Sequence, residues 1–335
     1  MGPCVVQDYE ADSFGFMIHV DNLGQVLLQE ADQATDRIVL VAPFIKRTVI
    51  DRLLQAASAS IAIDIVTRWR VHDVAMGASD PDVWEAVRSR VGATMRLVSN
   101  LHAKYYRFDD RYFIGSANLT QKALGWSQPN NVEVLVSAEG EDAASIKQML
   151  KDGIEVTDEL YRRFLQRVAE SEIERPVDDD FLDDDSPEDT RVSEPSATYK
   201  ASDWWTPSMR QPSQLYDVYA GEPDDVTRAG REQAREDLRH FAIQVGLSRE
   251  AFEAEVAWQL FQKPVVQEIN SFTESSRRFG AVRDHLKGLP CAERSNFDAT
   301  RTWQTLIRWL LYFIPDEYEM HTANYSEIFQ HVPGK

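Results

Sequence analysis

Apolar positions along the first half of the chain follow two periodicities in turn. Runs of consecutive apolar residues over 37–45 and 61–66 are typical of strands buried on both faces. Apolar residues at helical spacing predict helices over 23–34 and 46–59. The same criteria predict four later elements: a helix over 81–90, strands over 94–98 and 131–136, and a mainly helical stretch over 141–170. Alternating strands and helices predict a layered α/β/α domain whose mixed sheet is at least partly parallel.

The pattern changes after residue 203. Residues 204–335 show mostly helical periodicity, clearest over 224–245, 249–261 and 300–314. This stretch predicts a smaller, mostly helical domain without recognisable chemistry of its own. Its tryptophans are more typical of core or docking aromatics than of a base-stacking platform: Trp204, Trp205, Trp303 and Trp309.

A strongly acidic segment separates the two patterns. Residues 171–190 hold ten acidic residues and a single basic one, Arg175, and residues rich in Ser, Pro and Thr follow up to 203. Such a segment repels itself, so we expect a solvated linker over 171–203 rather than a mimic of nucleic-acid phosphates. The predicted organisation is a catalytic domain over 1–170, this linker, and a helical domain over 204–335 for partner docking or substrate selection.

Composition excludes some classes of protein. The net charge of −19 argues against a basic surface over the whole molecule, although the linker carries nearly half of that charge and leaves room for a local basic groove. Cys4 and Cys291 provide neither a disulfide framework nor a zinc site. We expect no membrane-spanning helix, because no apolar run reaches about 18 residues, and no secretory signal. These features predict a cytoplasmic protein.

Residues 101–120 carry the densest chemistry of the chain. Two apolar-aromatic runs flank Asp109 and Asp110, a pattern that predicts a β-hairpin with the acidic pair in its turn. A three-residue turn ending at Arg111 would place Phe108 opposite Tyr112.

Counting outward from that turn places polar side chains opposite one another. Lys104 would lie opposite Ser116, and His102 opposite Asn118. An imidazole, an ammonium, a hydroxyl and an amide on one face suit gripping and attacking a phosphate. A neutral imidazole is a competent nucleophile if a neighbour fixes its tautomer, and Glu133, the one carboxylate of the strand predicted at 131–136, is the candidate. No other cluster has metal-ligand spacing, so we expect neither metal nor cofactor.

The spacing His102-x-Lys104-x4-Asp109, followed by Gly115-Ser116-x-Asn118, resembles the His-Lys-Asp motif of the phospholipase D superfamily. Further segments look like the bacterial phospholipase D-like nuclease branch: Pro43-Phe44, 67–70, 77–80, Asn131 and Glu133. The resemblance covers roughly residues 15–150. One departure is that five residues, not the family's usual six, separate the motif's aspartate from its glycine.

The resemblance implies a mechanism. His102 attacks the phosphorus to form a phosphohistidine, which water then hydrolyses without a metal. Lys104, Ser116 and Asn118 would hold the phosphate oxygens. The family takes its general acid from a second copy of the motif, and this chain has one copy, so we expect a homodimer that shares one site.

Other candidate residues have weaker support. For Arg68 and Arg70, contact with substrate phosphates competes evenly with structural pairing to Asp73 or Asp80. Thr120 is a further candidate for substrate binding. Asp109 belongs to the catalytic motif, but its place in the turn favours support of the hairpin over chemistry.

Three functions remain. The leading one is a metal-independent nuclease, most simply a DNA endonuclease of bacterial restriction or phage defence. The C-terminal half is acidic, so we expect a protein partner such as a helicase or ATPase to choose the target. The alternatives are a phospholipid hydrolase or phosphatidyltransferase, which would need a membrane-facing surface, and a non-catalytic interaction protein.

Overall fold

The computed structural model describes residues 15–142, 144–171, 204–221, 225–294, 297–323 and 326–333. The described residues form two compact units. The N-terminal unit comprises 15–69 and 73–161, and the C-terminal unit comprises 70–72, 162–171 and the described residues from 204 onward. The linker predicted over 171–203 lies outside the described residues except for Ser171. The domain boundaries stay predictions.

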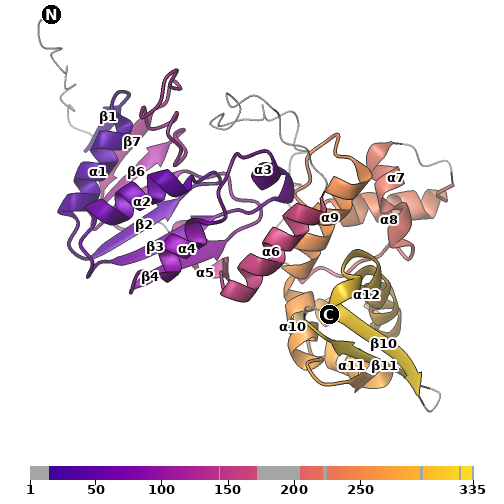
Figure 1. The fold of residues 1–335 in the computed structure, drawn as a ribbon. Coiled ribbons are helices and arrows are strands. Elements are labelled where there is room, and N and C mark those ends of the chain that lie inside the picture. Colours follow the sequence, from indigo (N-terminus) through magenta and orange to yellow (C-terminus); the bar gives the residue numbers. More distant parts are fainter. Residues whose placement is uncertain are drawn as a thin grey trace, which may run out of the picture. The chain divides into compact units, whose positions relative to one another are not determined.

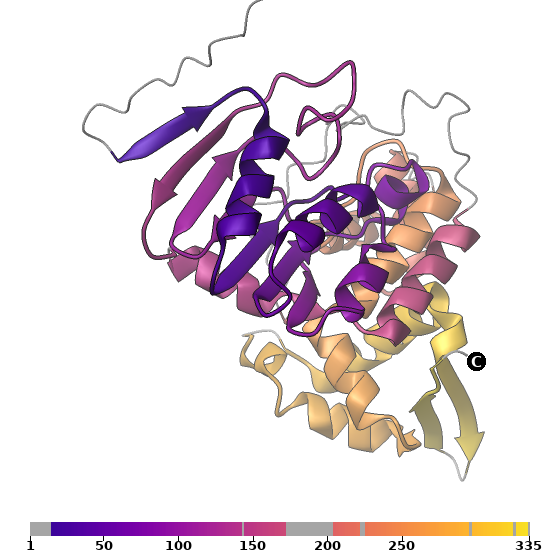
Figure 2. The same cartoon turned by 60° about the vertical axis from the view of Figure 1, so that its left-hand side comes forward.

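The N-terminal unit is built on a mixed sheet that counts eight strands among the described residues, in the order β1-β7-β6-β5-β2-β3-β4-β8. Strands β2 (Arg37–Val41), β3 (Ala62–Thr67) and β4 (Ala93–Leu97) run parallel. The remaining strands pair antiparallel: β1 (Phe16–His19), β5 (Tyr105–Phe108), β6 (Arg111–Gly115), β7 (Leu135–Glu139) and β8 (Ile154–Glu155) (Figures 1 and 2). The predicted mixed α/β sheet is confirmed.

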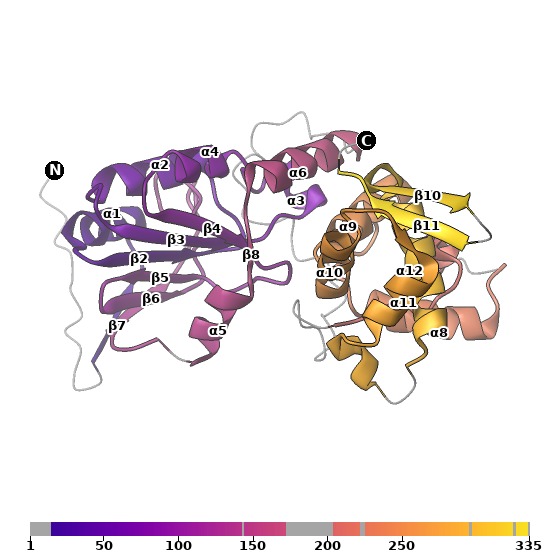
Figure 3. The same cartoon turned by 90° about the horizontal axis from the view of Figure 1, so that it is seen from below.

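Helices cover both faces of this sheet. Helices α1 (Leu23–Gln33), α2 (Arg47–Ala56) and α4 (Val83–Arg88) lie on one face, and α5 (Ala144–Asp152) lies on the other (Figure 3). Two further helices are α3 (Val71–Ala75) and α6 (Asp158–Glu170). Side chains of β2 are buried on both faces, as its continuous apolar run predicts. Leu150 and Ile146 of α5 pack on a cluster around Val39, Val41 and Tyr105.

The predicted three-residue turn of the hairpin is wrong. Phe108 pairs with Arg111, so the turn contains only Asp109 and Asp110, and every pairing shifts by one residue from the prediction. Asp109 has φ of 51°, in the left-handed region that Asp adopts more readily than most residues. Its carboxylate accepts hydrogen bonds from the backbone N–H groups of residues 35–37, which hold the tight turn in place.

The strand predicted over 131–136 begins later, at Leu135. Val132 and Val134 flank Glu133 and give the alternation of a half-buried strand, but both are exposed, Val132 completely. Glu133 therefore lies in the connection before β7 and not in the strand.

The C-terminal unit is mainly helical, as predicted. Its helices are α7 (Leu215–Ala220), α8 (Arg228–Leu238), α9 (Arg249–Phe261), α10 (Pro264–Phe272), α11 (Phe279–Leu286) and α12 (Ala299–Phe313). A small antiparallel sheet, which the sequence did not predict, joins β9 (Arg277–Arg278), β10 (Tyr318–Ala323) and β11 (Ser326–His331). Trp205, Trp303 and Trp309 are fully buried, which fits core aromatics. Among the described helices, none combines the length and the apolar character that a membrane crossing requires.

A buried carboxyl group of α8 anchors the chain that enters this unit. Asp237 accepts hydrogen bonds from the backbone N–H groups of Ser208 and Met209, at 3.0 and 2.7 Å, and from the Ser208 hydroxyl at 3.1 Å. Burial raises the pKa of Asp237 to about 7, although these hydrogen bonds act in the opposite direction.

This raised pKa predicts a pH-dependent stability. In the unfolded chain the carboxyl titrates near its ordinary value of about 3.9, so between that pH and about 7 the folded state holds a proton that the unfolded state has lost. The contribution of this group is largest below pH 4 and falls as pH rises, by about 1.4 kcal/mol per unit at the steepest. Asp237→Asn should remove this slope.

Denaturant unfolding of both proteins between pH 5 and pH 8 checks this. We expect the stability of the wild-type C-terminal unit to decline more steeply with pH than that of the variant. Parallel profiles for the two proteins would contradict the assignment.

Candidate active site

Four connections meet at one end of the sheet of the N-terminal unit. They follow β2, follow β3, precede β5, and join β6 to β7. The pairs Val41–Tyr105, Tyr105–Ile114 and Gly115–Leu135 place the corresponding strand ends side by side. Sites in sheets of this kind gather at the carboxyl ends of the parallel strands. The connections that leave this end carry the residues predicted to act on a phosphate: His102, Lys104, Ser116, Asn118 and Glu133.

His102 and Lys104 lie just before β5, because that strand begins at Tyr105. The sequence predicted that both residues lie on the face of a strand, and this is wrong. The His102 side chain is exposed and that of Lys104 is half-buried. The Lys104 ammonium donates a hydrogen bond to the backbone carbonyl of His102 at 3.2 Å. A fixed positive charge is thus held beside the imidazole-bearing residue.

Ser116 and Glu133 are joined directly. The Ser116 hydroxyl donates to the Glu133 carboxylate, and it accepts from the backbone N–H of Val134 at 3.1 Å. Asn131 donates to the other carboxylate oxygen at 3.5 Å. The close approach depends on Gly115, since a Cβ there would lie 2.0 Å from the Val134 carbonyl oxygen.

Asn118 is a buried amide on a fixed stretch of backbone. Its Oδ1 has no hydrogen-bond partner among the described residues, and its side chain is 4% exposed. The Tyr106 hydroxyl donates to the Ala117 carbonyl at 2.5 Å, and the Leu119 N–H donates to the Phe44 carbonyl at 3.2 Å. A buried amide without a partner is costly. The Oδ1 atom accepts and needs a donor, whereas the amide N–H groups of Asn118 can donate to a phosphate oxygen.

Arg68 supports the loop that carries His102. Its guanidinium pairs with buried Asp73 at 3.1 Å and donates to the Leu101 carbonyl at 3.0 Å. Of the alternatives left open by the sequence, pairing with Asp73 is the one observed. Asp80 instead accepts from the backbone N–H of Arg47 at the start of α2, at 2.9 Å. Backbone carbonyls such as that of Leu101 leave no signal in a sequence, so sequence reasoning could not find this support.

Arg70 and Thr120 lie in different surroundings. Arg70 is buried and belongs to the C-terminal unit, and its Nε and Nη1 have no hydrogen-bond partner among the described residues. The Thr120 hydroxyl accepts from the Ala123 N–H at 3.3 Å, as in a turn. Substrate contacts by either residue stay predictions.

Asp109 lies at the opposite end of β5 from His102. Besides its backbone contacts, its carboxylate accepts from the Thr35 hydroxyl at 2.9 Å. Burial alone would raise the pKa of Asp109, but the hydrogen bonds from Arg37, Thr35 and Asp36 outweigh it and lower the pKa below its usual value. This geometry assigns Asp109 to hairpin support and separates it from the site.

No group of three or more His, Cys, Asp or Glu side chains in the described part of the chain is arranged to hold a metal ion.

Comparisons with known proteins address the N-terminal unit. Residues 27–152 match the family model described as cardiolipin synthase, PLD-like domain. Comparison with curated proteins gave no match. Among solved structures, NucT from Helicobacter pylori is 16% identical with a TM-score of 0.31, over 45% of this chain and 95% of that chain. Phosphatidylserine synthase from Haemophilus influenzae Rd KW20 is 13% identical with a TM-score of 0.33, over 41% of this chain and 36% of that one. The family match supports phosphodiesterase-type chemistry.

The Asp109 contacts predict a specific loss of stability. Asp109→Ala removes the acceptor of four hydrogen bonds and should lower the free energy of unfolding by about 2 kcal/mol. Because the pKa of Asp109 is lowered on folding, its contribution is present above the ordinary pKa and is lost as pH falls through the lowered value. The difference between the two proteins should therefore shrink in acid.

Asp110→Ala is the matched control, since the neighbouring carboxylate is 93% exposed and makes only a long ion pair with Arg107, at 3.6 Å, among the described residues. Its effect should stay within about 0.5 kcal/mol of wild type. Equal unfolding midpoints for both variants in urea at neutral pH would rule out the support role.

Proposed function

Residues 27–152 form a phospholipase D-like domain, and on that premise we propose that this protein is a phosphodiesterase that cleaves nucleic acid through His102. One observation carries the proposal: strand pairing brings the segments 102–104 and 116–118 to the same end of neighbouring strands. This pairing places a nucleophile, a fixed cation and an amide donor at one end of the sheet, and these are groups that act on a phosphodiester.

In the first step a ring nitrogen of His102 forms a bond to phosphorus, and the bond from phosphorus to the leaving ester oxygen breaks. Lys104 and Asn118 stabilise the charge on the non-bridging oxygens. A general acid gives its proton to the leaving oxygen. In the second step water attacks the phosphohistidine and gives a proton to the group that served as the general acid; the P–N bond breaks, and His102 is regenerated. Glu133 accepts a hydrogen bond from Ser116 and so holds the segment that leads to Asn118. It is also the candidate to orient the imidazole of His102.

We propose that the general acid is His102 of a second copy of the chain. An exposed apolar row beside the site supports such an interface. Ile18, Val136 and Ile114 occupy paired positions on β1, β7 and β6. Ile18 is 56% and Ile114 48% exposed, and the row ends next to Gly115 and Ser116. Burial of this row between two copies would bring two sites together around a two-fold axis.

We favour nucleic acid over lipid as the substrate because of the segments that resemble the nuclease branch. Those segments border the site: the loop at Pro43 and Phe44 bonds to Leu119, and Ser79 and Asp80 brace it from the other side. The role that fits best is a DNA endonuclease in bacterial restriction or phage defence, cytoplasmic, with a helicase or ATPase as a partner for the C-terminal unit.

Cleavage assays in EDTA test the proposed chemistry. The protein is incubated with plasmid DNA, single-stranded DNA, RNA and phospholipid vesicles. We expect cleavage of DNA without added metal, and a loss of about 10³-fold or more in His102→Ala. Turnover of phospholipid alone would contradict this proposal and favour a phospholipid hydrolase or phosphatidyltransferase. The description of the matched family, cardiolipin synthase, names a lipid enzyme.

The interface predicts a second outcome. Ile114→Asp places a charge in the apolar row and should convert a dimer into a monomer, with phosphodiesterase activity falling together with dimer content. Val91→Asp is the matched control, because Val91 is 91% exposed just before β4, at the other end of the sheet. Analytical ultracentrifugation of both variants measures the fraction of dimer. An active, monomeric wild-type protein would disprove the shared site.

A further inference from the structure

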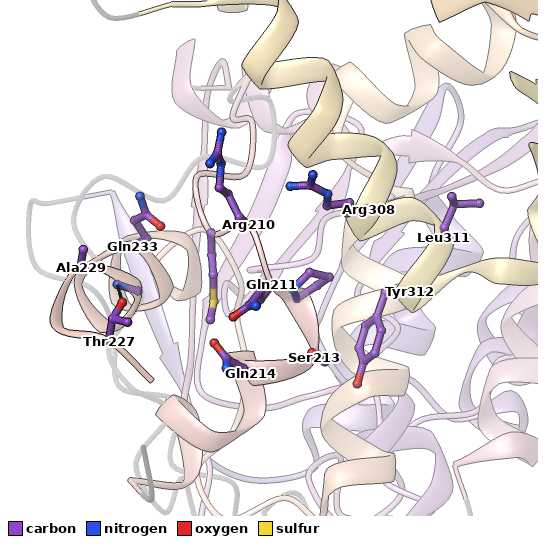
Figure 4. A pocket seen from close by; sticks show the side chains of 13 residues that line it. Arg210, Gln211, Ser213, Gln214, Thr227, Ala229, Gln233, Arg308, Leu311 and Tyr312 are labelled. Carbon is purple, nitrogen blue, oxygen red and sulfur yellow. Dashed lines mark hydrogen bonds between the residues drawn. The ribbon is translucent and has the colours of Figure 1, made fainter. Parts of the chain in front are cut away.

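The C-terminal unit contains a cavity of about 810 Å³ that is open to solvent. Its wall comes from residues 209–214 at the entry to α7, from the start of α8, and from one face of α12 (Figure 4). Cavities of about 300–1,000 Å³ are typical of small-molecule sites. The site of the N-terminal unit contributes no residue to this lining.

The charge of the lining is unusual for this chain. Among the described residues, the lining includes the exposed side chains of Arg210 and Arg308 and no carboxylate, although the protein carries a net charge of −19. Neither arginine has an ion pair or a hydrogen bond among the described residues. In Figure 4 the Arg308 side chain extends from α12 toward Arg210. Two guanidinium groups without a carboxylate partner favour an anionic ligand.

Both arginines stand on fixed backbone. Met209, next to Arg210, donates its N–H to Asp237 and accepts from the Trp309 indole N–H at 2.8 Å. Trp309 is fully buried and adjacent to Arg308. The hydrogen bond from Trp309 therefore ties the helix of one arginine to the loop of the other. Such preorganisation reduces the entropy cost of gripping a ligand.

The rest of the lining narrows the class of ligand. Arg guanidinium groups match phosphate oxygens in a bidentate manner. The positive end of α8, whose first turn contributes Ala229, adds a favourable potential. The cavity also contains amide groups of Gln211, Gln214 and Gln233, which can donate and accept hydrogen bonds at a base edge. The Tyr312 hydroxyl donates a hydrogen bond to Glu253 at 2.8 Å, and its ring packs edge-to-face with Phe313.

We propose that this cavity binds a nucleotide, with Arg210 and Arg308 holding its phosphate. The same chemistry has two sources, a free nucleotide or the phosphorylated end of a strand. The proposal does not depend on the phosphodiesterase function of the N-terminal unit.

Calorimetry on the full chain tests the proposal with ADP and with a 5′-phosphorylated single-stranded oligonucleotide. Both titrations are repeated in His102→Ala, which removes any turnover. We expect binding of ADP, of the oligonucleotide, or of both. Arg210→Ala and Arg308→Ala should each weaken it by about 10-fold or more, and Arg308→Lys less, because it keeps the charge but not the bidentate geometry. Binding of ADP identifies a free nucleotide; binding of the oligonucleotide alone identifies a strand end.

Arg301→Ala is the matched control. Arg301 is exposed on the same helix, two turns before Arg308, and does not line the cavity. Its affinity should stay within about twofold of wild type. The proposal is overturned if neither ligand binds, or if both cavity variants, folded by circular dichroism, bind as wild type does. Equal binding of an acidic peptide that the same variants abolish would also overturn the nucleotide assignment.

Discussion

The position of His102 depends on a buried ion pair. Asp73 is fully buried, and its carboxylate holds the Arg68 guanidinium, which in turn binds the carbonyl of Leu101. Removing one partner of such a pair leaves an uncompensated charge in the interior and costs about 3–5 kcal/mol. The loop before β5 is thus held by an interaction that is expensive to break, although the imidazole it carries is exposed.

The other half of the site is fixed by hydrogen bonds to the backbone. Residues 116–119 bond to Val134, Tyr106, Phe44 and Lys46. These contacts are made by the backbone of the segment and not by the Asn118 side chain. The backbone under this amide is thus fixed, as preorganised electrostatic stabilisation requires.

The sequence predicted the parallel strands and the residues of the motif because both are local signals. The hairpin register was wrong by one residue, because it is set by contacts of Asp109 with residues more than 70 positions earlier. The start of β7 was misplaced because exposed Val132 and Val134 imitate a strand. The edge strands β1 and β8 and the small C-terminal sheet are too short, or too dependent on distant partners, to leave a pattern.

Arginine side chains fall into two groups in this acidic protein. Many arginines form ion pairs with carboxylates of their own unit, such as Arg37 with Asp64 and Arg163 with Glu317. Arg210 and Arg308 differ because no ion pair joins either of them to a carboxylate of the described residues. The loop of Arg210 is in turn bound by Asp237, whose raised pKa lies near neutrality. Ionised Asp237 is the stronger acceptor for the N–H of Met209, so the charge of one buried carboxyl group connects the stability of the C-terminal unit to the order of the loop that carries Arg210.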